Sequence, residues 1–297
     1  MAQLEWVTDG GLETDLLFHH GQELPEFAAF PLLEQPSGRE LLTTYYRGYA
    51  QVAQAAAAGL VLETPTWRAG AEWGSRLGYG PADLSRLNTA AVGLLREVAE
   101  STGVGQVRLS GVVGPRGDGY VADGTDADQA AEAHLPQVRA LAEAGVDVVH
   151  AMTLTGPAEA IGVVRAARSA GVPVGISFTV ETDGRLPDGT PLARAVEQVD
   201  ALAAPDWFGV NCAHPLHVLP ALDGGAWQER LKCFRPNAST LTHAELDVME
   251  VLDEGDRELL VSSTGSLLDL LPSVAILGGC CGTDSTHVAA LWGAVST

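Results

Sequence analysis

The fold class of this 297-residue chain is decided by one stretch, residues 146–179, which reads VDVVHAMTLTGPAEAIGVVRAARSAGVPVGISFT. Its two ends, residues 146–151 and 172–179, are short runs rich in β-branched residues, as expected of buried strands. Residues 157–170 between them have the spacing of an amphipathic helix. A strand, a helix and a second strand in this order predict a parallel βαβ unit.

The same alternation continues on both sides of this stretch and predicts eight strands. A single (β/α)8 TIM barrel spanning residues 1–297 as one domain is the fold expected from this count and length. A doubly wound open sheet is the competing topology, and periodicity alone does not separate the two. The strands are expected at residues 6–9, 60–63, 107–113, 146–151, 172–179, 207–211, 230–234 and 274–278, and the clearest helices at 39–58, 83–101, 129–144, 157–170 and 191–202.

Composition argues against several classes of function. The chain has 17 basic and 38 acidic residues, a formal charge of −21, which argues against nucleic-acid partners and membrane surfaces and favours simple solubility. No apolar run approaches the roughly 20 residues that span a bilayer, and the first residues lack the features of a signal peptide. We therefore expect a cytoplasmic protein with reduced cysteines, which favours metal or catalytic roles over disulfides.

Three of the four cysteines directly follow expected strands. Cys212 follows the sixth strand, and Cys280 and Cys281 follow the eighth within Gly-Gly-Cys-Cys-Gly-Thr (residues 278–283). In a parallel barrel these positions open on one face, and strands six and eight are near neighbours. Three thiolates with one open position suit zinc, and the flanking glycines free the backbone to turn both adjacent sulfurs inward. The alternative is that these cysteines are buried hydrophobic residues, and it would be preferred for Cys212 taken alone. We interpret Cys233, on the seventh strand itself, as a core residue or at most a neighbour of the site.

These residues resemble the homocysteine S-methyltransferase family, over nearly the whole chain from about Asp9 to His287. The Gly-Gly-Cys-Cys-Gly-Thr motif is specific, whereas Asp-Gly-Gly is weak alone. The resemblance is carried by Asp9-Gly10-Gly11-Leu12-Glu13-Thr14, Asn211-Cys212, Pro236-Asn237 and Gly278-Gly279-Cys280-Cys281-Gly282-Thr283.

The resemblance implies a barrel that binds one Zn²⁺ through Cys212, Cys280 and Cys281, with an acceptor thiol as the fourth ligand. By the same resemblance, Asp9 contacts the amino group of an amino-acid acceptor, and amides near Gly10 and Gly11 receive its carboxylate. The implied reaction moves a methyl group from a small onium donor to a thiol, most simply homocysteine, giving methionine. S-methylmethionine or S-adenosylmethionine is the expected donor, with betaine second.

Other residues are expected at the barrel mouth because each follows a strand. Asn211, Asn237 and Thr283 should surround the metal. Trp67, after the second strand, could hold an onium donor by a cation–π contact, or simply pack a loop. Glu245, together with His243, follows the seventh strand and could line the mouth, with an exposed helix start as the equal alternative.

One position departs from the family pattern. The family usually has a glutamate before threonine at the end of strand four, where it helps to hold the ammonium group of the acceptor; here Met152 precedes Thr153. Methionine cannot pair with an ammonium. Either Asp9, helped by Glu245 or Glu63, holds the ammonium, or the acceptor lacks one. The chain could thus methylate a different thiol or a selenol, and a non-catalytic zinc-binding barrel is a further alternative.

Overall fold

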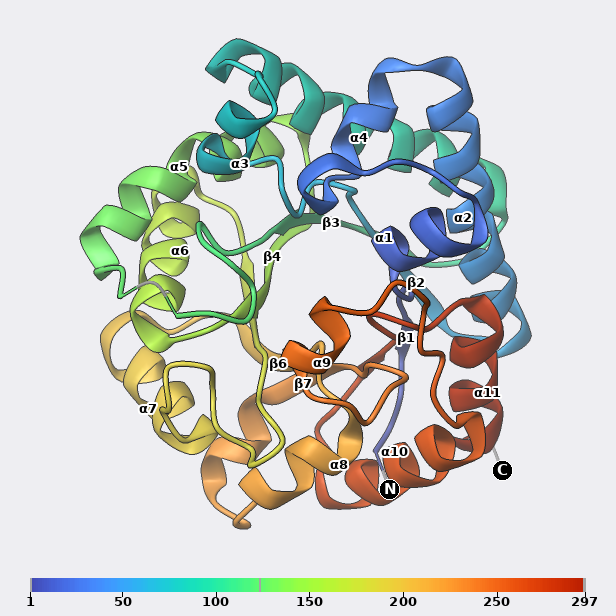
Figure 1. The fold of residues 1–297 in the computed structure, drawn as a ribbon, viewed down its shortest axis with the longest axis vertical. Coiled ribbons are helices and arrows are strands. Elements are labelled where there is room, and N and C mark those ends of the chain that lie inside the picture. The colour runs from blue at the N-terminus through green and yellow to red at the C-terminus, as the bar shows by residue number, and fades with distance from the viewer. Residues whose placement is uncertain (1, 123, 296–297) are drawn as a thin grey trace.

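We describe the protein from a computed structural model, in which residues 2–122 and 124–295 are described. Eight parallel strands pair in chain order, and β1 pairs with β8 to close the ring (Figure 1). The predicted (β/α)8 barrel is confirmed, and the open sheet is excluded. The strands are β1 (Trp6–Val7), β2 (Gly59–Glu63), β3 (Val107–Val113), β4 (Val148–Leu154), β5 (Val174–Phe178), β6 (Trp207–Asn211), β7 (Leu231–Arg235) and β8 (Ile276–Leu277).

The strand with the largest difference from expectation is β4. It ends at Leu154 rather than at residue 151, and its pairing with β5 is irregular between Ala151 and Leu154. Thr153 inside this irregularity has a φ of 60°. A β-branched residue rarely adopts this left-handed conformation, so periodicity could not predict the longer strand.

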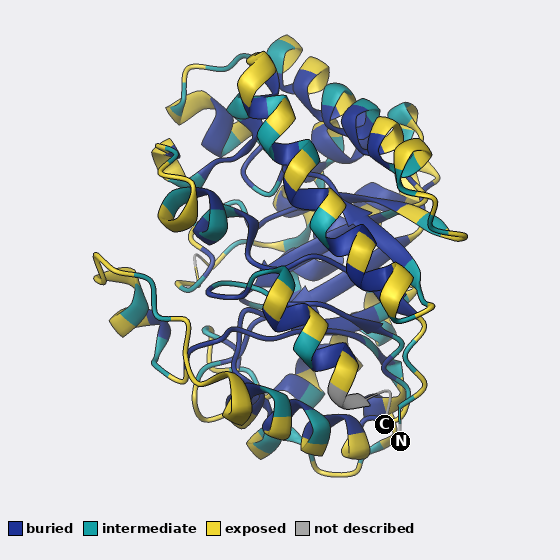
Figure 2. Ribbon diagram, turned by 90° about the vertical axis from the view of Figure 1, so that its right-hand side faces the viewer, coloured by how far each residue is buried: buried dark blue, intermediate teal, exposed yellow. Residues whose placement is uncertain are grey.

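Helices surround the barrel on the outside (Figure 1). All five helices predicted from the sequence are present: the one at residues 157–170 has the predicted ends, and the other four differ by at most three residues. In Figure 2 their outer faces are exposed while the strands are buried. The long helices are α2 (Pro36–Ala55), α4 (Pro81–Thr102), α5 (Ala127–Ala144), α6 (Pro157–Ala170), α7 (Leu192–Ala203), α10 (Arg257–Leu270) and α11 (Ser285–Val295). Short helices are α1 (Leu12–Thr14), α3 (Ala71–Arg76), α8 (Pro215–Val218), α9 (His243–Asp247), η1 (Asp15–His19), η2 (Pro25–Phe27), η3 (Phe30–Glu34), η4 (Leu219–Ala221) and η5 (Ala226–Arg230).

The barrel interior changes from apolar to charged along the strands. Trp6, Val61, Cys233 and Ile276 form one buried apolar cluster, so the interpretation of Cys233 as a core residue is confirmed. Side chains two residues apart on a strand point to the same side. Two residues after Val61 on β2 comes Glu63, and two residues after Cys233 on β7 comes Arg235. Both charged side chains therefore point into the interior, at the carboxyl ends of the strands.

A second, larger apolar core lies between the strands and the surrounding helices. It includes the fully buried side chains of Leu60, Ile176, Phe208 and Leu277 on the strands. Within the described part of the chain, no helix is both long and apolar enough to cross a membrane.

Candidate active site

The three cysteines that the sequence singles out come together at the carboxyl ends of the strands. Cys212 Sγ lies 3.1 Å from Cys280 Sγ and 3.6 Å from Cys281 Sγ. All three sulfur atoms lie within 4.8 Å of one another. The chain positions of these residues are far apart, and the closed ring is what makes them neighbours.

The backbone around Cys212 is strained and held from several sides. Cys212 has a φ of 59°, a conformation that costs energy in a residue with a Cβ. Its carbonyl oxygen accepts hydrogen bonds from Asn237 Nδ2 at 3.1 Å, His243 Nε2 at 2.7 Å and Thr179 Oγ1 at 3.2 Å. Three donors on one oxygen fix the turn that directs the Cys212 sulfur into the site.

The loop after β8 supplies the other two sulfurs. The Cys280 amide donates to the carbonyl of Pro236 at 2.7 Å, and the Thr283 hydroxyl donates to the carbonyl of Cys280 at 2.7 Å. Gly282 has a φ of 77°, which glycine adopts without strain. This tight loop lets two adjacent cysteines face the same point, which a regular strand would forbid.

The sulfurs are surrounded by few polar groups other than one another. Asn211 Nδ2 lies 3.7 Å from Cys280 Sγ, and the Tyr120 hydroxyl lies 3.2 Å from Cys212 Sγ. Hydrogen bonds from Cys212 and Cys281 hold the pKa of Cys280 well below its usual range. The hydrogen bond with Cys280 raises the pKa of Cys212, and the hydrogen bonds with Cys212 and then Cys280 raise the pKa of Cys281. The cluster thus favours one thiolate that two thiols stabilise.

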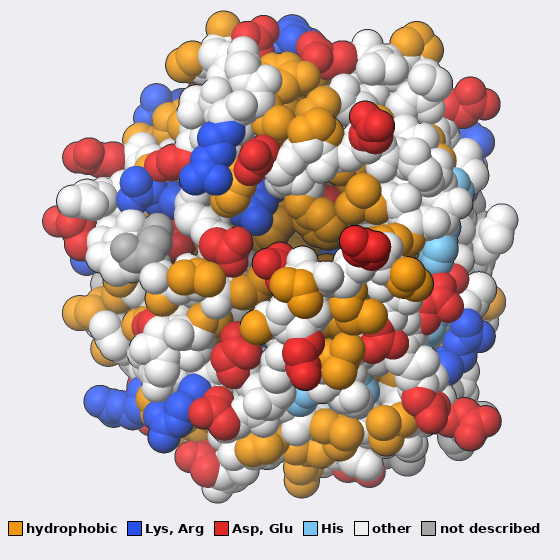
Figure 3. Space-filling model, viewed as in Figure 1, with side chains coloured by type: hydrophobic (Ala, Val, Ile, Leu, Met, Phe, Trp, Pro, Cys, Tyr) orange, Lys and Arg blue, Asp and Glu red, His pale blue; other side chains and the backbone are white. Residues whose placement is uncertain are grey.

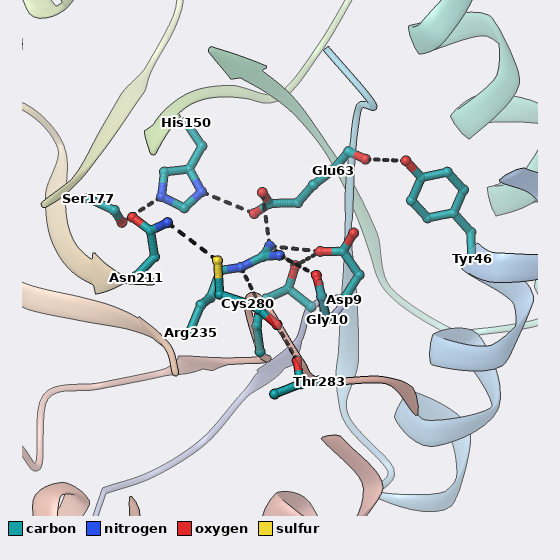
Figure 4. A network of polar contacts seen from close by, with 12 residues as sticks. Asp9, Gly10, Tyr46, Glu63, His150, Ser177, Asn211, Arg235, Cys280 and Thr283 are labelled. Atoms are coloured by element: carbon teal, nitrogen blue, oxygen red, sulfur yellow. Dashed lines mark hydrogen bonds and ion pairs between the residues drawn. The ribbon is translucent and has the colours of Figure 1, made fainter. Parts of the chain in front are cut away.

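Asn211 also holds the neighbouring strand in register. Its Oδ1 accepts from the Thr153 amide at 2.7 Å, and its Nδ2 donates to the Thr153 hydroxyl at 2.8 Å. These two bonds support the left-handed backbone of Thr153 at the end of β4. Asn211 therefore links the irregular end of β4 to the cysteine cluster, as Figure 4 shows for its contact with Cys280.

The turn after β1 packs tightly against the cysteine loop. A Cβ at Gly10 would lie 2.6 Å from the Thr283 carbonyl oxygen, and one at Gly11 would lie 2.5 Å from the Cys280 carbonyl oxygen. Only glycine permits this approach. The Gly11 amide donates to Thr283 at 2.9 Å, so this amide is already engaged in the described structure.

A buried charged network lies beside the cysteines (Figure 4). Arg235 is central: its Nη1 lies 2.7 Å from Asp9 Oδ1 and 3.1 Å from Glu63 Oε2. Glu63 Oε1 lies 3.0 Å from His150 Nδ1, and His150 Nε2 lies 2.7 Å from the Ser177 hydroxyl. We call Asp9, Glu63, His150 and Arg235 the charged network.

Burial and ion pairing act in opposite directions on the two carboxylates of this network. Burial raises the pKa of Asp9 to about 6, against the opposing attraction of Arg235. Burial also acts on Glu63, but the charges of Arg235 and His150 outweigh it and lower the pKa of Glu63. Both carboxylates are therefore ionised at neutral pH, and Arg235 neutralises part of their charge.

Two adjoining cavities open from the cysteines. The inner one, about 60 Å³, is lined by residues that include Asp9, Glu13, Met152, Cys212 and Cys280. The outer one, about 280 Å³, shares Phe27, Trp67, Tyr120 and Cys281 with it. Figure 3 shows the hollow at the centre of this face, with hydrophobic side chains inside it and acidic ones around it.

A larger depression lies away from the cysteines and carries no cluster of chemistry-bearing side chains. It measures about 660 Å³ and is lined by residues before β1, after α2 and before β3, including Gln3, Ala57 and Gly105. These positions belong to the amino-terminal end of the strands, where barrel residues contribute to stability rather than to catalysis.

The structure brings most of the predicted mouth residues to the cysteines. Asp9, Gly10, Gly11 and Asn211 line the inner cavity, and Trp67 lines both cavities. Asn237 lines the outer cavity. The Arg68 guanidinium stacks over Trp67, 4.0 Å from the ring centroid, so one face of this indole is already covered by a cation.

The sequence predicts that Glu245 and His243 could both line the barrel mouth, but the structure places their side chains in different surroundings. Glu245 is exposed, and its carboxylate accepts from the amide and hydroxyl of Thr242 at 2.9 and 2.7 Å, capping α9. The structure does not bring Glu245 to the cysteines. His243 is buried, stacks on Tyr120 at 4.2 Å and contacts Glu181 at 2.9 Å.

Several site residues have no signal strong enough to be found from sequence. Arg235 and His150 are polar residues within strands that are mostly apolar, and Tyr120 lies in a loop after β3. Alternation along β2 and β7 could have placed Glu63 and Arg235 inside the barrel. Nothing in the sequence predicts which of these groups pair.

The cysteine cluster fits a tetrahedral metal ion. Zinc–sulfur bonds of about 2.3 Å place tetrahedral sulfur ligands about 3.8 Å apart, close to the separations found here. Three soft sulfur donors on one side of a cavity, with space beyond them, match a site that keeps one position open.

Comparison with known proteins agrees with this geometry. A family model described as homocysteine S-methyltransferase matches residues 6–295. The homocysteine S-methyltransferase of Escherichia coli (strain K12) is 28% identical over 320 aligned positions, covering 96% of this chain and 93% of that protein. The homocysteine S-methyltransferase YbgG of Bacillus subtilis (strain 168) is 32% identical over 123 positions, 38% of each chain.

Solved structures share the fold. The metallated form of the homocysteine methyltransferase MmuM from Escherichia coli has a TM-score of 0.76 at 23% identity, covering 98% of this chain and 96% of that chain. Its oxidized form has a TM-score of 0.77 at 23% identity, covering 97% and 95%. Because the family model spans nearly the whole chain, this protein belongs to the homocysteine S-methyltransferase family and is a methyltransferase.

Proposed function

We propose that this protein transfers a methyl group from a small onium donor to the thiol of homocysteine, giving methionine, with Zn²⁺ held by Cys212, Cys280 and Cys281. The observation that carries the proposal is the convergence of three sulfurs within 4.8 Å beside a cavity. The relatives named as homocysteine S-methyltransferases, and a neighbour solved in a metallated form, support it.

The inner cavity is the proposed acceptor site. A free thiol has a pKa of about 8.5 and is mostly protonated at neutral pH. Zinc bound by the three cysteines would favour the thiolate of the acceptor. Residues of the chain do the rest: Asn211 and Tyr120 contact the cysteine sulfurs, and the turn at Gly10 and Gly11 closes the cavity wall.

The outer cavity is the proposed donor site. Phe27, Trp67 and Tyr120 supply aromatic surface at the passage between the two cavities, and aromatic rings attract cations when water is excluded. Asp118 and Asp247 line the outer cavity and add negative charge. These features favour an onium donor. S-methylmethionine or S-adenosylmethionine is the proposed choice, and betaine is second.

Methyl transfer between the two cavities is a single displacement. The acceptor sulfur supplies the electron pair of the new S–CH₃ bond. The donor S⁺–CH₃ bond breaks, and its electron pair stays on the donor sulfur, which becomes a neutral thioether. Charge therefore disappears from the donor as the bond breaks. An apolar passage favours this step because it solvates the localised charge of the onium donor less well than the transition state, in which that charge is dispersed.

The test combines metal analysis with a product screen. Purified protein should contain about one zinc per chain. Methyl-labelled S-methylmethionine, S-adenosylmethionine and betaine are each incubated with homocysteine, with a thiol lacking the amino group and with a selenol. Labelled methionine formed only in the presence of bound metal supports the proposal. Full activity of metal-free protein, or labelled product only from another thiol or selenol, contradicts it.

A further inference from the structure

The inner cavity lacks a carboxylate at the position where one is expected. Met152 lines this cavity at the end of β4 and is buried. An acceptor that carries an ammonium group needs a negative partner there, because an unpaired buried ammonium is costly. The cavity must obtain this partner from another residue if the acceptor is an amino acid.

Two carboxylates of the inner cavity, Glu63 and Asp9, already form ion pairs with other residues. Glu63 pairs with Arg235 and His150. Asp9 pairs with Arg235 at 2.7 Å and accepts from the Tyr45 hydroxyl at 3.3 Å. Neither carboxylate can serve fully as a counter-charge for a further cation while Arg235 remains between them.

Glu13 is the remaining carboxylate of the inner cavity. It lies in α1, is half-buried, and lines the cavity together with Asp9 and Cys280. No ion pair is formed by the Glu13 side chain with any other residue that the structure describes. Burial raises its pKa to about 7, and the negative charges of Cys280 and Asp9 add to this effect. These are the surroundings of a carboxylate that lacks a cation.

We propose that Glu13 binds the ammonium group of an amino-acid thiol whose sulfur reaches the cysteine cluster. The proposal rests on the proposed function, since it assigns a residue to the acceptor site. In homocysteine the thiol and the ammonium are joined by a short flexible chain, so both must bind within one small cavity. Glu13 and Cys280 line that cavity, whereas Met152 offers the acceptor only an apolar contact.

The experiment compares Glu13→Gln with the natural protein, using homocysteine and 4-sulfanylbutanoic acid, which lacks only the amino group. Losing a charge-assisted hydrogen bond should lower kcat/KM for homocysteine about tenfold to a hundredfold. The value for 4-sulfanylbutanoic acid should stay within about twofold, because it has no ammonium to lose. Asp15→Asn is the matched control, since Asp15 lies two residues further along the chain and pairs with His19 at 2.9 Å.

A second variant moves the carboxylate to another position that lines the inner cavity. Glu13→Gln combined with Met152→Glu should restore at least part of the homocysteine preference. Equal effects of Glu13→Gln on both thiols, or no effect on either, would overturn the proposal.

A binding measurement separates this proposal from the proposed function. Calorimetric titration with methionine and with 4-(methylsulfanyl)butanoic acid requires no turnover. Tighter binding of methionine that is lost in Glu13→Gln supports the role of Glu13 even if no donor is found. Equal binding of both compounds by the natural protein overturns it.

Discussion

The charged network and the cysteine cluster lie side by side at the barrel mouth, but they differ in whether their charges are paired. In the charged network, Arg235 stands between Asp9 and Glu63, and each charged group has a partner inside the network. In the cysteine cluster, the sulfurs contact mainly one another. The ion pairs inside the charged network neutralise its charges and hold its side chains in place. The cysteine sulfurs have no such partner among the residues that the structure describes, so their negative charge can bind a cation from outside.

The largest effect should come from the cysteine cluster. Cys212→Ala removes one of three proposed metal ligands, so metal content should fall and activity should drop by at least about a hundredfold. Metal analysis and kcat/KM measure these effects. Cys233→Ala is the matched control because Cys233 is equally buried but lies in the apolar cluster. If Cys233→Ala loses as much metal as Cys212→Ala, the metal is not held specifically by the cysteine cluster.

The next largest effect should come from breaking the charged network. Arg235→Met leaves Asp9 and Glu63 buried without their cation, which should lower the free energy of unfolding by about 3–5 kcal/mol. Arg39→Met is the control, because Arg39 pairs with Glu97 at the surface and should change it by less than about 1 kcal/mol. Urea denaturation at neutral pH measures both. Equal changes in the free energy of unfolding in the two variants would show that the charged network does not stabilise the fold more than a surface ion pair does.

The two regions also differ in how far sequence could predict them. The cysteines follow strands directly, and a closed ring of eight strands is enough to bring them together. The charged network depends on which side chains meet across the interior, and this is set by the register between the strands that carry them. No local pattern encodes that pairing.

Glu13 shows a further reason for incomplete prediction. An acidic residue in the first turn of a helix is common because it complements the helix dipole, so its sequence context gives no reason to assign it to a cavity. Only the tight packing of the turn at Gly10 and Gly11 against the Cys280 loop brings α1 to the acceptor site.

A moderate effect is expected from pH. The pKa of Glu13 is raised to about 7, so Glu13 gains its negative charge as pH rises through this value. The acceptor ammonium stays protonated between about pH 5.5 and 7.5, because the amino group of a free amino acid is more basic than that of a peptide. The ratio of kcat/KM for homocysteine to that for 4-sulfanylbutanoic acid should therefore rise about tenfold from pH 5.5 to 7.5. Using a ratio removes the pH dependence of the thiol group itself.

Asp9 and Arg235 face the same cavity as Glu13, and Asp9, with a pKa of about 6, also titrates in this range. The Glu13→Gln variant separates the two groups. In that variant the step near pH 7 should disappear, while any step near pH 6 should remain. A ratio that keeps its step near pH 7 without Glu13 would assign the titration to another group.

The smallest effect should come from Glu245, which tests how far the acceptor site extends. Its carboxylate accepts from the Thr242 amide and hydroxyl and caps α9, and its side chain is exposed. Glu245→Gln should therefore leave kcat/KM for homocysteine within about twofold of the natural protein. His243→Ala is the informative counterpart on the same helix, because His243 donates to the Cys212 carbonyl at 2.7 Å. It should lower activity measurably through the position of Cys212. A large loss of kcat/KM in Glu245→Gln would contradict this expectation. It would mean that α9 moves to contact the acceptor and that the acceptor site extends beyond the inner cavity.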